Sequence, residues 1–120
     1  MSRDIDVFKM ILGFSGYNIA KPNIHWEPLV DIYELTDKIV ILVELPGVKK
    51  EDIDITLKDG ILRISGVRKE LNFENRVKIY RMEMNYGYFE KVIEVGDVNE
   101  EAISAELRDG ILIINIQKSF

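Results

Sequence analysis

The chain has 120 residues, of which 47% are apolar and 31% are charged, and its formal net charge is −5. This composition is typical of one globular domain with a modest core and argues against a disordered chain. Lys and Arg form no dense cluster, so we expect no nucleic-acid partner, because neutralising phosphates requires a basic surface. The chain has no cysteine, which excludes disulfides and thiolate chemistry.

The first 24 residues differ from the rest of the sequence. Residues 5–14 are apolar at helical spacing and on more than one side, and residues 17–23 resemble a linker. We expect a short helical or mobile N-terminal arm, because a helix of about ten residues is marginal in water on its own. The apolar residues of this arm are Ile5, Val7, Phe8, Ile11, Leu12 and Phe14. Two roles stay open: a segment for assembly or for binding unfolded chains, and a helix packed on its own domain.

The same segment argues against a membrane-spanning or secreted protein. Asp4, Asp6 and Lys9 interrupt the apolar stretch, which is too short to span a bilayer and lacks the pattern of a signal peptide. We therefore expect a cytoplasmic protein with no stable membrane insertion.

From residue 25 onward the pattern favours β-strands. Residues 28–35 and 38–45 are the first two candidates, and the continuous apolar run from Ile39 to Val43 predicts a strand covered on both faces. The dipeptide Pro46-Gly47 then predicts a turn.

Two nearly identical stretches predict two β-hairpins. They begin at Ile55 and Ala105, and in each an alternating apolar run leads to Asp-Gly and then to a second apolar run. Asp-Gly supplies the positive φ angles that a two-residue hairpin turn needs. We expect one hairpin over residues 53–67 and the other over residues 103–117.

Residues 68–86 interrupt this pattern with a charged insertion, in which Val77–Tyr80 could form a short strand. A loop of this length is uncommon in a compact domain unless it has a task. A further strand is expected at residues 88–95 and a turn at residues 98–102. Counting the insertion, the chain has roughly seven to eight strands, the number expected of an immunoglobulin-like antiparallel β-sandwich.

Three sequence signatures point to a known family. The run Glu44–Ile53 combines a leucine-proline-glycine turn with a charged entry to the next strand. Tyr86–Lys91 contains a tyrosine-glycine-x-phenylalanine element, and Ala105–Leu112 is similar to the signature alanine-x-x-x-x-glycine-valine-leucine. In this order and spacing, they resemble the small heat-shock proteins of the microbial type, whose shared core is the α-crystallin domain. The resemblance extends over about residues 25–118.

The resemblance implies an ATP-independent holding chaperone, which binds unfolding proteins and prevents their aggregation. Its partners would be non-native client proteins and further copies of itself. Holding requires no catalytic residue, metal or cofactor, so we expect none and no enzyme activity. The resemblance also divides the chain into the apolar arm and linker at residues 1–24 and an α-crystallin domain at residues 25–120.

In the family's microbial branch, the insertion carries a strand that pairs with the second strand of a partner subunit. Carried over by position, the exchanged strand is Val77, Lys78, Ile79 and Tyr80, and its acceptor is Asp31, Ile32 and Tyr33. Such an exchange satisfies two backbone edges at once, so the resemblance implies a strand-exchanged homodimer.

The resemblance also implies a groove between the fourth and eighth strands, which in the family receives an isoleucine-x-isoleucine tail from another dimer. The matching residues are Ile53, Ile55 and Leu57 on one wall and Ile103, Ala105 and Leu107 on the other. The alternative is that these six side chains are simply part of the core.

Departures from the family pattern bear on assembly. Ile114-Asn115-Ile116 has the letters of the tail motif but falls inside a predicted strand, and the chain stops at Phe120. We therefore expect dimers or small oligomers rather than shells closed by tail docking. Met84 and Lys91 stand where many relatives carry arginine, so the ion pairs of the dimer are expected to be arranged differently, because neither residue reproduces two-point pairing.

Other chemistries find little support in the sequence. The 21 acidic residues mostly alternate with apolar residues or lie at turns, as on a solvated face. His25 is the only histidine, which gives no basis for a metal site or a hydrolytic triad, and no phosphate-binding loop is present. The main alternative function is a protein-interaction β-sandwich that docks on a folded partner, such as a CS-domain cochaperone. Such domains usually lack the insertion and the apolar arm.

Overall fold

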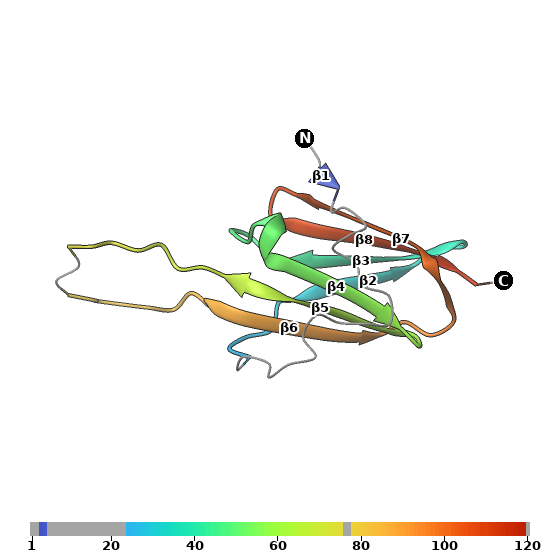
Figure 1. The fold of residues 1–120 in the computed structure, drawn as a ribbon, viewed down its shortest axis with the longest axis horizontal. Helices are drawn as coiled ribbons and strands as arrows, with labels where there is room; N and C mark the ends of the chain where they lie inside the picture. Colours follow the sequence, from blue (N-terminus) through green and yellow to red (C-terminus); the bar gives the residue numbers. More distant parts are fainter. Residues whose placement is uncertain (1–2, 5–23, 76–77, 120) are drawn as a thin grey trace.

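The structure, a computed structural model, describes residues 3–4, 24–75 and 78–119, and it contains two packed antiparallel sheets (Figure 1). The strand order is β1-β7-β8-β3-β2 in the larger sheet and β4-β5-β6 in the smaller one. The strands are β1 (Arg3–Asp4), β2 (Val30–Glu34), β3 (Lys38–Glu44), β4 (Ile53–Lys58), β5 (Ile61–Arg68), β6 (Gly87–Glu94), β7 (Val98–Arg108) and β8 (Ile111–Lys118). One turn of 3-10 helix, η2 (Lys50–Asp52), leads into β4. The predicted antiparallel β-sandwich is confirmed.

The predicted N-terminal helix and its six apolar residues lie outside the described residues, as does Val77. Arg3–Asp4 form β1, which pairs antiparallel with Glu106 and Leu107 of β7. The larger sheet therefore receives its fifth strand from the start of the chain.

Both Asp-Gly turns have the predicted conformation. The φ angles are 53° at Asp59, 75° at Gly60, 51° at Asp109 and 82° at Gly110. Positive φ at both central positions is the turn type whose twist matches that of the flanking strands. Accordingly β4 pairs with β5, and β7 with β8, directly across these turns.

The turn predicted at residues 98–102 is wrong, because these residues are the first half of β7. The chain reverses earlier, around Gly96, whose φ is 76°. The register between β7 and β8 shifts between Val98 and Ile103, so an irregularity in the pairing accommodates these residues within the strand.

The core lies between the two sheets and is entirely apolar. Its buried side chains are Ile41, Val43, Leu45, Val48, Ile53, Ile55, Leu57, Leu62, Ile64, Phe89, Ile93, Ala105, Leu112, Ile114 and Ile116. Burying one Leu, Ile or Phe side chain contributes roughly 1.5–3 kcal/mol, so this cluster is the main source of stability. Among the described residues, no polar or charged side chain is buried.

Strand β3 departs from one expectation. Ile41 and Val43 are buried, but Ile39, Val40 and Leu42 remain partly exposed. The prediction that both faces of this strand are fully covered is therefore wrong, since the apolar run is longer than the single buried face requires.

The segment that precedes β2 attaches the start of the domain to β6. The backbone N–H groups of His25 and Trp26 both donate to the carbonyl oxygen of Tyr88, at 2.8 and 3.3 Å. The Trp26 ring packs on Phe89, with ring centroids 5.1 Å apart. The chain thus crosses from the smaller sheet to the larger one, and this crossing covers the core near Phe89.

Candidate assembly interface

Strand β2 forms one edge of the larger sheet in the part of the chain that the structure describes. Leu35 N–H donates to Lys38 O at 2.7 Å, and Glu44 N–H donates to Leu29 O at 3.0 Å. Because bonded and non-bonded pairs alternate along antiparallel strands, the peptide groups of Asp31 and Tyr33 face β3. Those of Val30, Ile32 and Glu34 then face outward, where another strand could pair with them.

The side chains of this edge are also unusually apolar. Leu29, Ile32, Tyr33 and Leu35 are between 44% and 72% exposed. An exposed apolar edge strand is a template for pairing with another chain. The structure places the predicted acceptor residues Asp31, Ile32 and Tyr33 on this edge, and among them only Ile32 directs its peptide groups outward.

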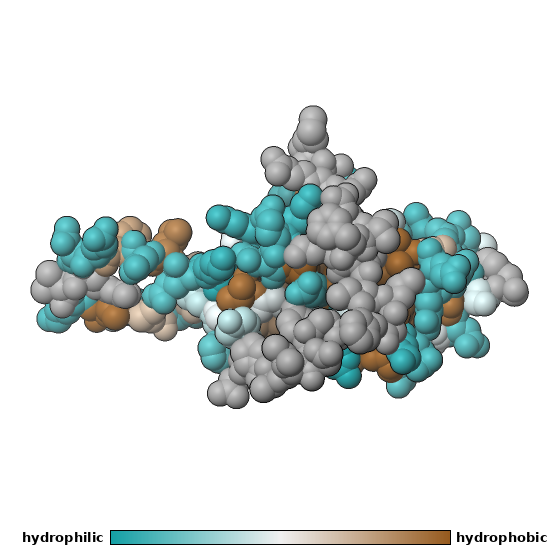
Figure 2. Space-filling view, in the orientation of Figure 1, coloured by the Kyte–Doolittle hydropathy of each residue, from teal (hydrophilic) through white to brown (hydrophobic). Residues whose placement is uncertain are grey.

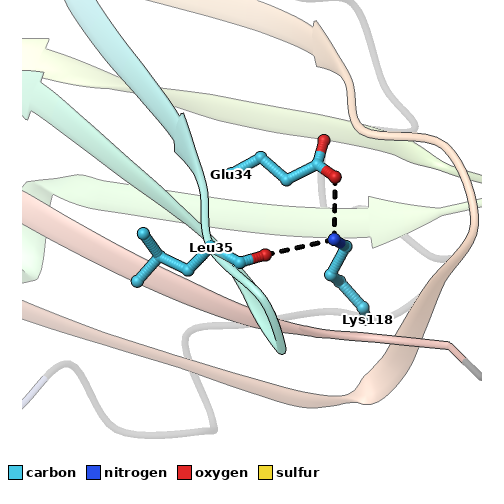
Figure 3. Close-up of polar contacts among 3 residues, drawn as sticks. All are labelled: Glu34, Leu35 and Lys118. Carbon is cyan, nitrogen blue, oxygen red and sulfur yellow. Dashed lines mark hydrogen bonds and ion pairs between the residues drawn. The ribbon is translucent and has the colours of Figure 1, made fainter.

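The side chain of Lys118 ties the end of β2 to β8 through two polar contacts (Figure 3). Lys118 Nζ lies 2.7 Å from Glu34 Oε2 and donates to the carbonyl oxygen of Leu35 at 3.1 Å. The hydrogen bond and the positive charge of Lys118 lower the pKa of Glu34 below its ordinary value. These contacts fix the end of the edge strand, whereas the outward peptide groups of Val30 and Ile32 lie further along it.

The insertion projects away from the sandwich (Figure 1). Its described residues, 69–75 and 78–86, form no strand within the single chain. Figure 2 shows apolar and polar side chains interspersed along this projection. The exposed apolar residues are Leu71, Phe73, Ile79, Tyr80, Met82 and Met84, between 52% and 87% exposed. An extended segment with this much apolar surface is suited to a contact outside its own chain.

The base of the insertion is held by Arg68, which the sequence analysis did not identify. Its Nε and Nη2 donate to the carbonyl oxygen of Asn85 at 2.8 and 2.6 Å, and its Nη1 donates to that of Pro46 at 3.0 Å. The guanidinium carbon lies 4.4 Å from the Trp26 ring centroid and 5.7 Å from the Tyr86 ring centroid. Arg68 thus connects both ends of the insertion to the turn after β3 and to the crossing segment.

The position of Gly87, where the insertion returns to β6, leaves no room for a side chain. Its φ is 95°, a conformation that residues with a side chain rarely adopt, and a Cβ atom there would collide with the His25 imidazole. Trp26 Nε1 also donates to the Gly87 carbonyl oxygen at 3.1 Å. Gly87 of the predicted tyrosine-glycine element is therefore required for close packing against the crossing segment.

The two predicted groove walls lie on β4 and β7, which are toward the same side of the sandwich (Figure 1). Residues that flank a two-residue hairpin turn exchange backbone hydrogen bonds, and outward and inward peptide groups then alternate along each strand. This register directs the peptide groups of all six residues away from the hairpin partner: Ile53, Ile55, Leu57, Ile103, Ala105 and Leu107.

The side chains of these six residues belong to the core. Ile53, Ile55, Leu57 and Ala105 are at most 4% exposed, while Ile103 and Leu107 pack half-buried against them. Only peptide groups and two partly covered side chains therefore remain for a ligand. Strand β1 already pairs with the Leu107 end of β7.

The structure also shows where the isoleucine-asparagine-isoleucine segment and Lys91 lie. Ile114 and Ile116 are fully buried in β8, so Ile114-Asn115-Ile116 is a core segment. Lys91 Nζ lies 3.2 Å from Glu27 Oε1, and Arg81 Nη1 lies 2.8 Å from Glu83 Oε2. Lys91, which stands where many relatives carry arginine, therefore forms an ion pair within its own chain.

No helix in the described part of the chain is long and apolar enough to cross a membrane. The same residues contain no group of three His, Asp or Glu side chains that could hold a metal ion. The described surface offers backbone pairing at strand edges and contact with apolar side chains.

Comparisons with known proteins agree with the β-sandwich fold. The profile of the "Hsp20/alpha crystallin family" matches residues 31–120. The small heat shock protein C2 of Rickettsia felis is 37% identical over 92 residues, which are 76% of this chain and 60% of that protein. The 22.0 kDa heat shock protein of Arabidopsis thaliana is 34% identical over 74% of this chain and 47% of its own length. The chain thus spans less than two thirds of these relatives.

Solved structures are similar over most of their own length. The hspA protein of Xanthomonas axonopodis has a TM-score of 0.70 and 34% identity, covering 78% of this chain and 94% of that one. A small heat-shock protein from Xylella fastidiosa has a TM-score of 0.72 and 32% identity, covering 80% of this chain and 89% of that one.

Proposed function

The chain belongs to the Hsp20/alpha crystallin family, and from this premise we propose that it is an ATP-independent holding chaperone that binds unfolding proteins and prevents their aggregation. The observation that carries the proposal is the presence, in one chain, of an apolar free edge, β2, and of an extended insertion with exposed apolar side chains. Neither needs a nucleotide, a metal or a catalytic group in order to act.

Holding is a matter of mass action. A protein that binds the unfolded state of a client lowers the concentration of free unfolded chains, and aggregation slows because it depends on that concentration. The binding surface has to be apolar, and the complex has to stay in solution. The apolar residues of the N-terminal arm fit the first requirement, and the net charge of −5 fits the second.

The chain acts as a homodimer in this proposal, in which the insertion of each subunit pairs with β2 of the other. Val77–Tyr80 is the exchanged segment, and the outward peptide groups of Ile32 and its neighbours accept it. Support comes from the exposure of Ile79 and Tyr80, 52% and 87%, and from the free edge of β2. Pairing would cover both surfaces in a single step.

The proposal assigns the remaining parts as well. Residues 1–24 are an arm for clients or assembly, and residues 25–120 are the domain that presents it. The β4 and β7 edges form a second docking groove, which offers peptide groups rather than side chains.

Activity is tested by heating a labile reporter protein with and without this chain, in the absence of ATP, while light scattering is followed. We expect suppression of scattering at an equal or excess molar ratio. Unchanged scattering would overturn the chaperone proposal. Deleting residues 1–20 should remove protection while leaving the β-rich circular dichroism spectrum intact; retained protection would assign client binding to the domain instead.

The dimer is tested separately by Ile32→Pro, which removes one outward N–H and no hydrogen bond to β3. Proline is tolerated on an edge strand in that position, so the domain should remain folded. The matched control is Ile32→Thr, which keeps the N–H. Sedimentation should give a monomer for Ile32→Pro and a dimer for Ile32→Thr. A dimeric Ile32→Pro variant would contradict the exchange.

A further inference from the structure

The two legs of the insertion carry facing apolar pairs. Leu71 and Phe73 alternate with polar residues on the outgoing leg, and Met82 and Met84 do so on the returning leg. Alternate residues of an extended segment share one face. A hollow of about 200 Å³ lies between the legs. Its lining residues are Glu70, Leu71, Phe73, Arg81, Met82, Glu83, Met84 and Tyr86.

Both methionines are accessible in the single chain, Met82 at 56% and Met84 at 68%. Tyr86 Oη donates to the Met84 sulfur at 3.5 Å. The guanidinium carbon of Arg68 lies 5.7 Å from the centroid of the Tyr86 ring. Met84 is therefore in contact with the residues that hold the base of the insertion. Arg81 and Glu83 occupy the alternate positions and pair with each other.

We propose that Met82 and Met84 are a modification site, at which a peroxide oxidises the thioethers to sulfoxides and thereby weakens the dimer. In the reaction, a sulfur lone pair attacks one peroxide oxygen, the O–O bond breaks and an S–O bond forms. With hydrogen peroxide, the proton of the attacked oxygen transfers to the second oxygen, which leaves as water. Sulfur loses two electrons, and the peroxide gains them.

The effect on assembly follows from polarity. Methionine is a flexible apolar side chain that fills irregular contacts, and its sulfoxide is polar and chiral. Covering a sulfoxide against Leu71, Phe73 or a partner's strand costs free energy that covering a thioether does not. A sulfoxide oxygen is also a stronger acceptor than sulfur, so the bond from Tyr86 changes its length and direction. The free protomer, whose two sulfurs are exposed, is the form that reacts.

This inference rests on the proposed strand-exchanged dimer, so the dimer is measured first. The dissociation constant of the untreated protein is determined by sedimentation. The protein is then treated with hydrogen peroxide, oxidation is mapped to each methionine by peptide mass spectrometry, and the constant is determined again. We expect an increase of about tenfold or more when both sites carry oxygen, and its reversal by methionine sulfoxide reductases.

The matched control is the double variant Met82→Leu with Met84→Leu, in which Met1 and Met10 remain oxidisable. Its dissociation constant, whatever its starting value, should not change with peroxide. An untreated protein that is monomeric overturns the exchanged dimer and, with it, the effect of oxidation on assembly. A dimer whose constant is unchanged with both sulfoxides present overturns this inference, as does an equal peroxide effect in the double variant. If that variant does not dimerise, restoration of the native dimer by the reductases decides the question.

Discussion

The guanidinium of Arg68 lies over the ring of Trp26, 4.4 Å from its centroid, while three of its N–H bonds reach the carbonyl oxygens of Asn85 and Pro46. One side chain thereby joins the end of β5, the return of the insertion, the turn after β3 and the crossing segment. Because it satisfies two carbonyl oxygens and stacks on an aromatic ring, its planar fork is essential to the contact.

Arg68→Lys should loosen the base of the insertion, because lysine keeps the charge but cannot bond to two carbonyl groups and stack at once. We expect a loss of about 1 kcal/mol in the free energy of unfolding and a shift in the fluorescence of Trp26, the only tryptophan. The control is Arg63→Lys, whose pair with Glu90 spans 3.6 Å with the Arg63 side chain 46% exposed, and which should contribute little. Equal effects of the two variants would refute the special role of Arg68.

Gly87→Ala should destabilise the domain more than Gly96→Ala, although both glycines have positive φ. At Gly96, with φ 76°, an added Cβ meets no atom within 4 Å. The loss in unfolding free energy should therefore be about 1 kcal/mol, from the strained backbone alone. At Gly87 the collision with His25 raises the expected loss to about 2–4 kcal/mol. Urea unfolding followed by circular dichroism measures both. A similar loss in both variants would mean that His25 moves aside freely.

Leu57→Ala should cost about 3 kcal/mol of unfolding free energy, since Leu57 is 0% exposed and its removal leaves a cavity. Leu71→Ala, the same substitution at a residue that is 71% exposed, should cost almost nothing. Thermal unfolding distinguishes them. A tolerant Leu57 would indicate that β4 presents its side chains to a groove rather than to the core.

The pKa of Glu34 should lie below its ordinary value of 4.5 and return toward it in Lys118→Met, because Lys118 supplies both the hydrogen bond and the opposite charge. The contribution of this pair to stability is present above pH 4.5 and disappears as the pH falls through the lowered pKa of the folded protein. Carboxyl NMR titration measures the shift. At about 1 M salt, where the Debye length is about 3 Å, the shift should shrink. A shift that is unaffected by Lys118→Met would rule out this cause.

Much of the fold follows from local sequence signals. The Asp-Gly turns fix where each hairpin reverses, and strict alternation around Ile55 and Leu62 fixes which face is buried. Even the outward direction of the groove peptide groups follows from the hairpin register, which a two-residue turn determines.

The features that the sequence did not predict depend on contacts between residues that are far apart in the chain. Residues 98–102 contain two acidic side chains, yet they belong to β7, because Val98 and Ile103 on either side of the irregularity both pair with β8, which no local pattern reveals. Arg68 could not be recognised because its partners Trp26, Pro46 and Asn85 come from different parts of the chain. A residue whose contacts are backbone carbonyl oxygens and a distant aromatic ring produces no recognisable sequence motif.

Local unfolding at the start of the domain has a consequence for the insertion. The bond from Trp26 Nε1 to the Gly87 carbonyl oxygen and that from His25 N–H to Tyr88 connect the two places where flanking segments leave the sandwich. Opening either one exposes the other, so the two should exchange amide hydrogen with solvent as one cooperative unit. Temperature or a bound client that releases the crossing segment would then also release the returning leg. In thermodynamic terms, the proposed client-binding and assembly equilibria would then be linked.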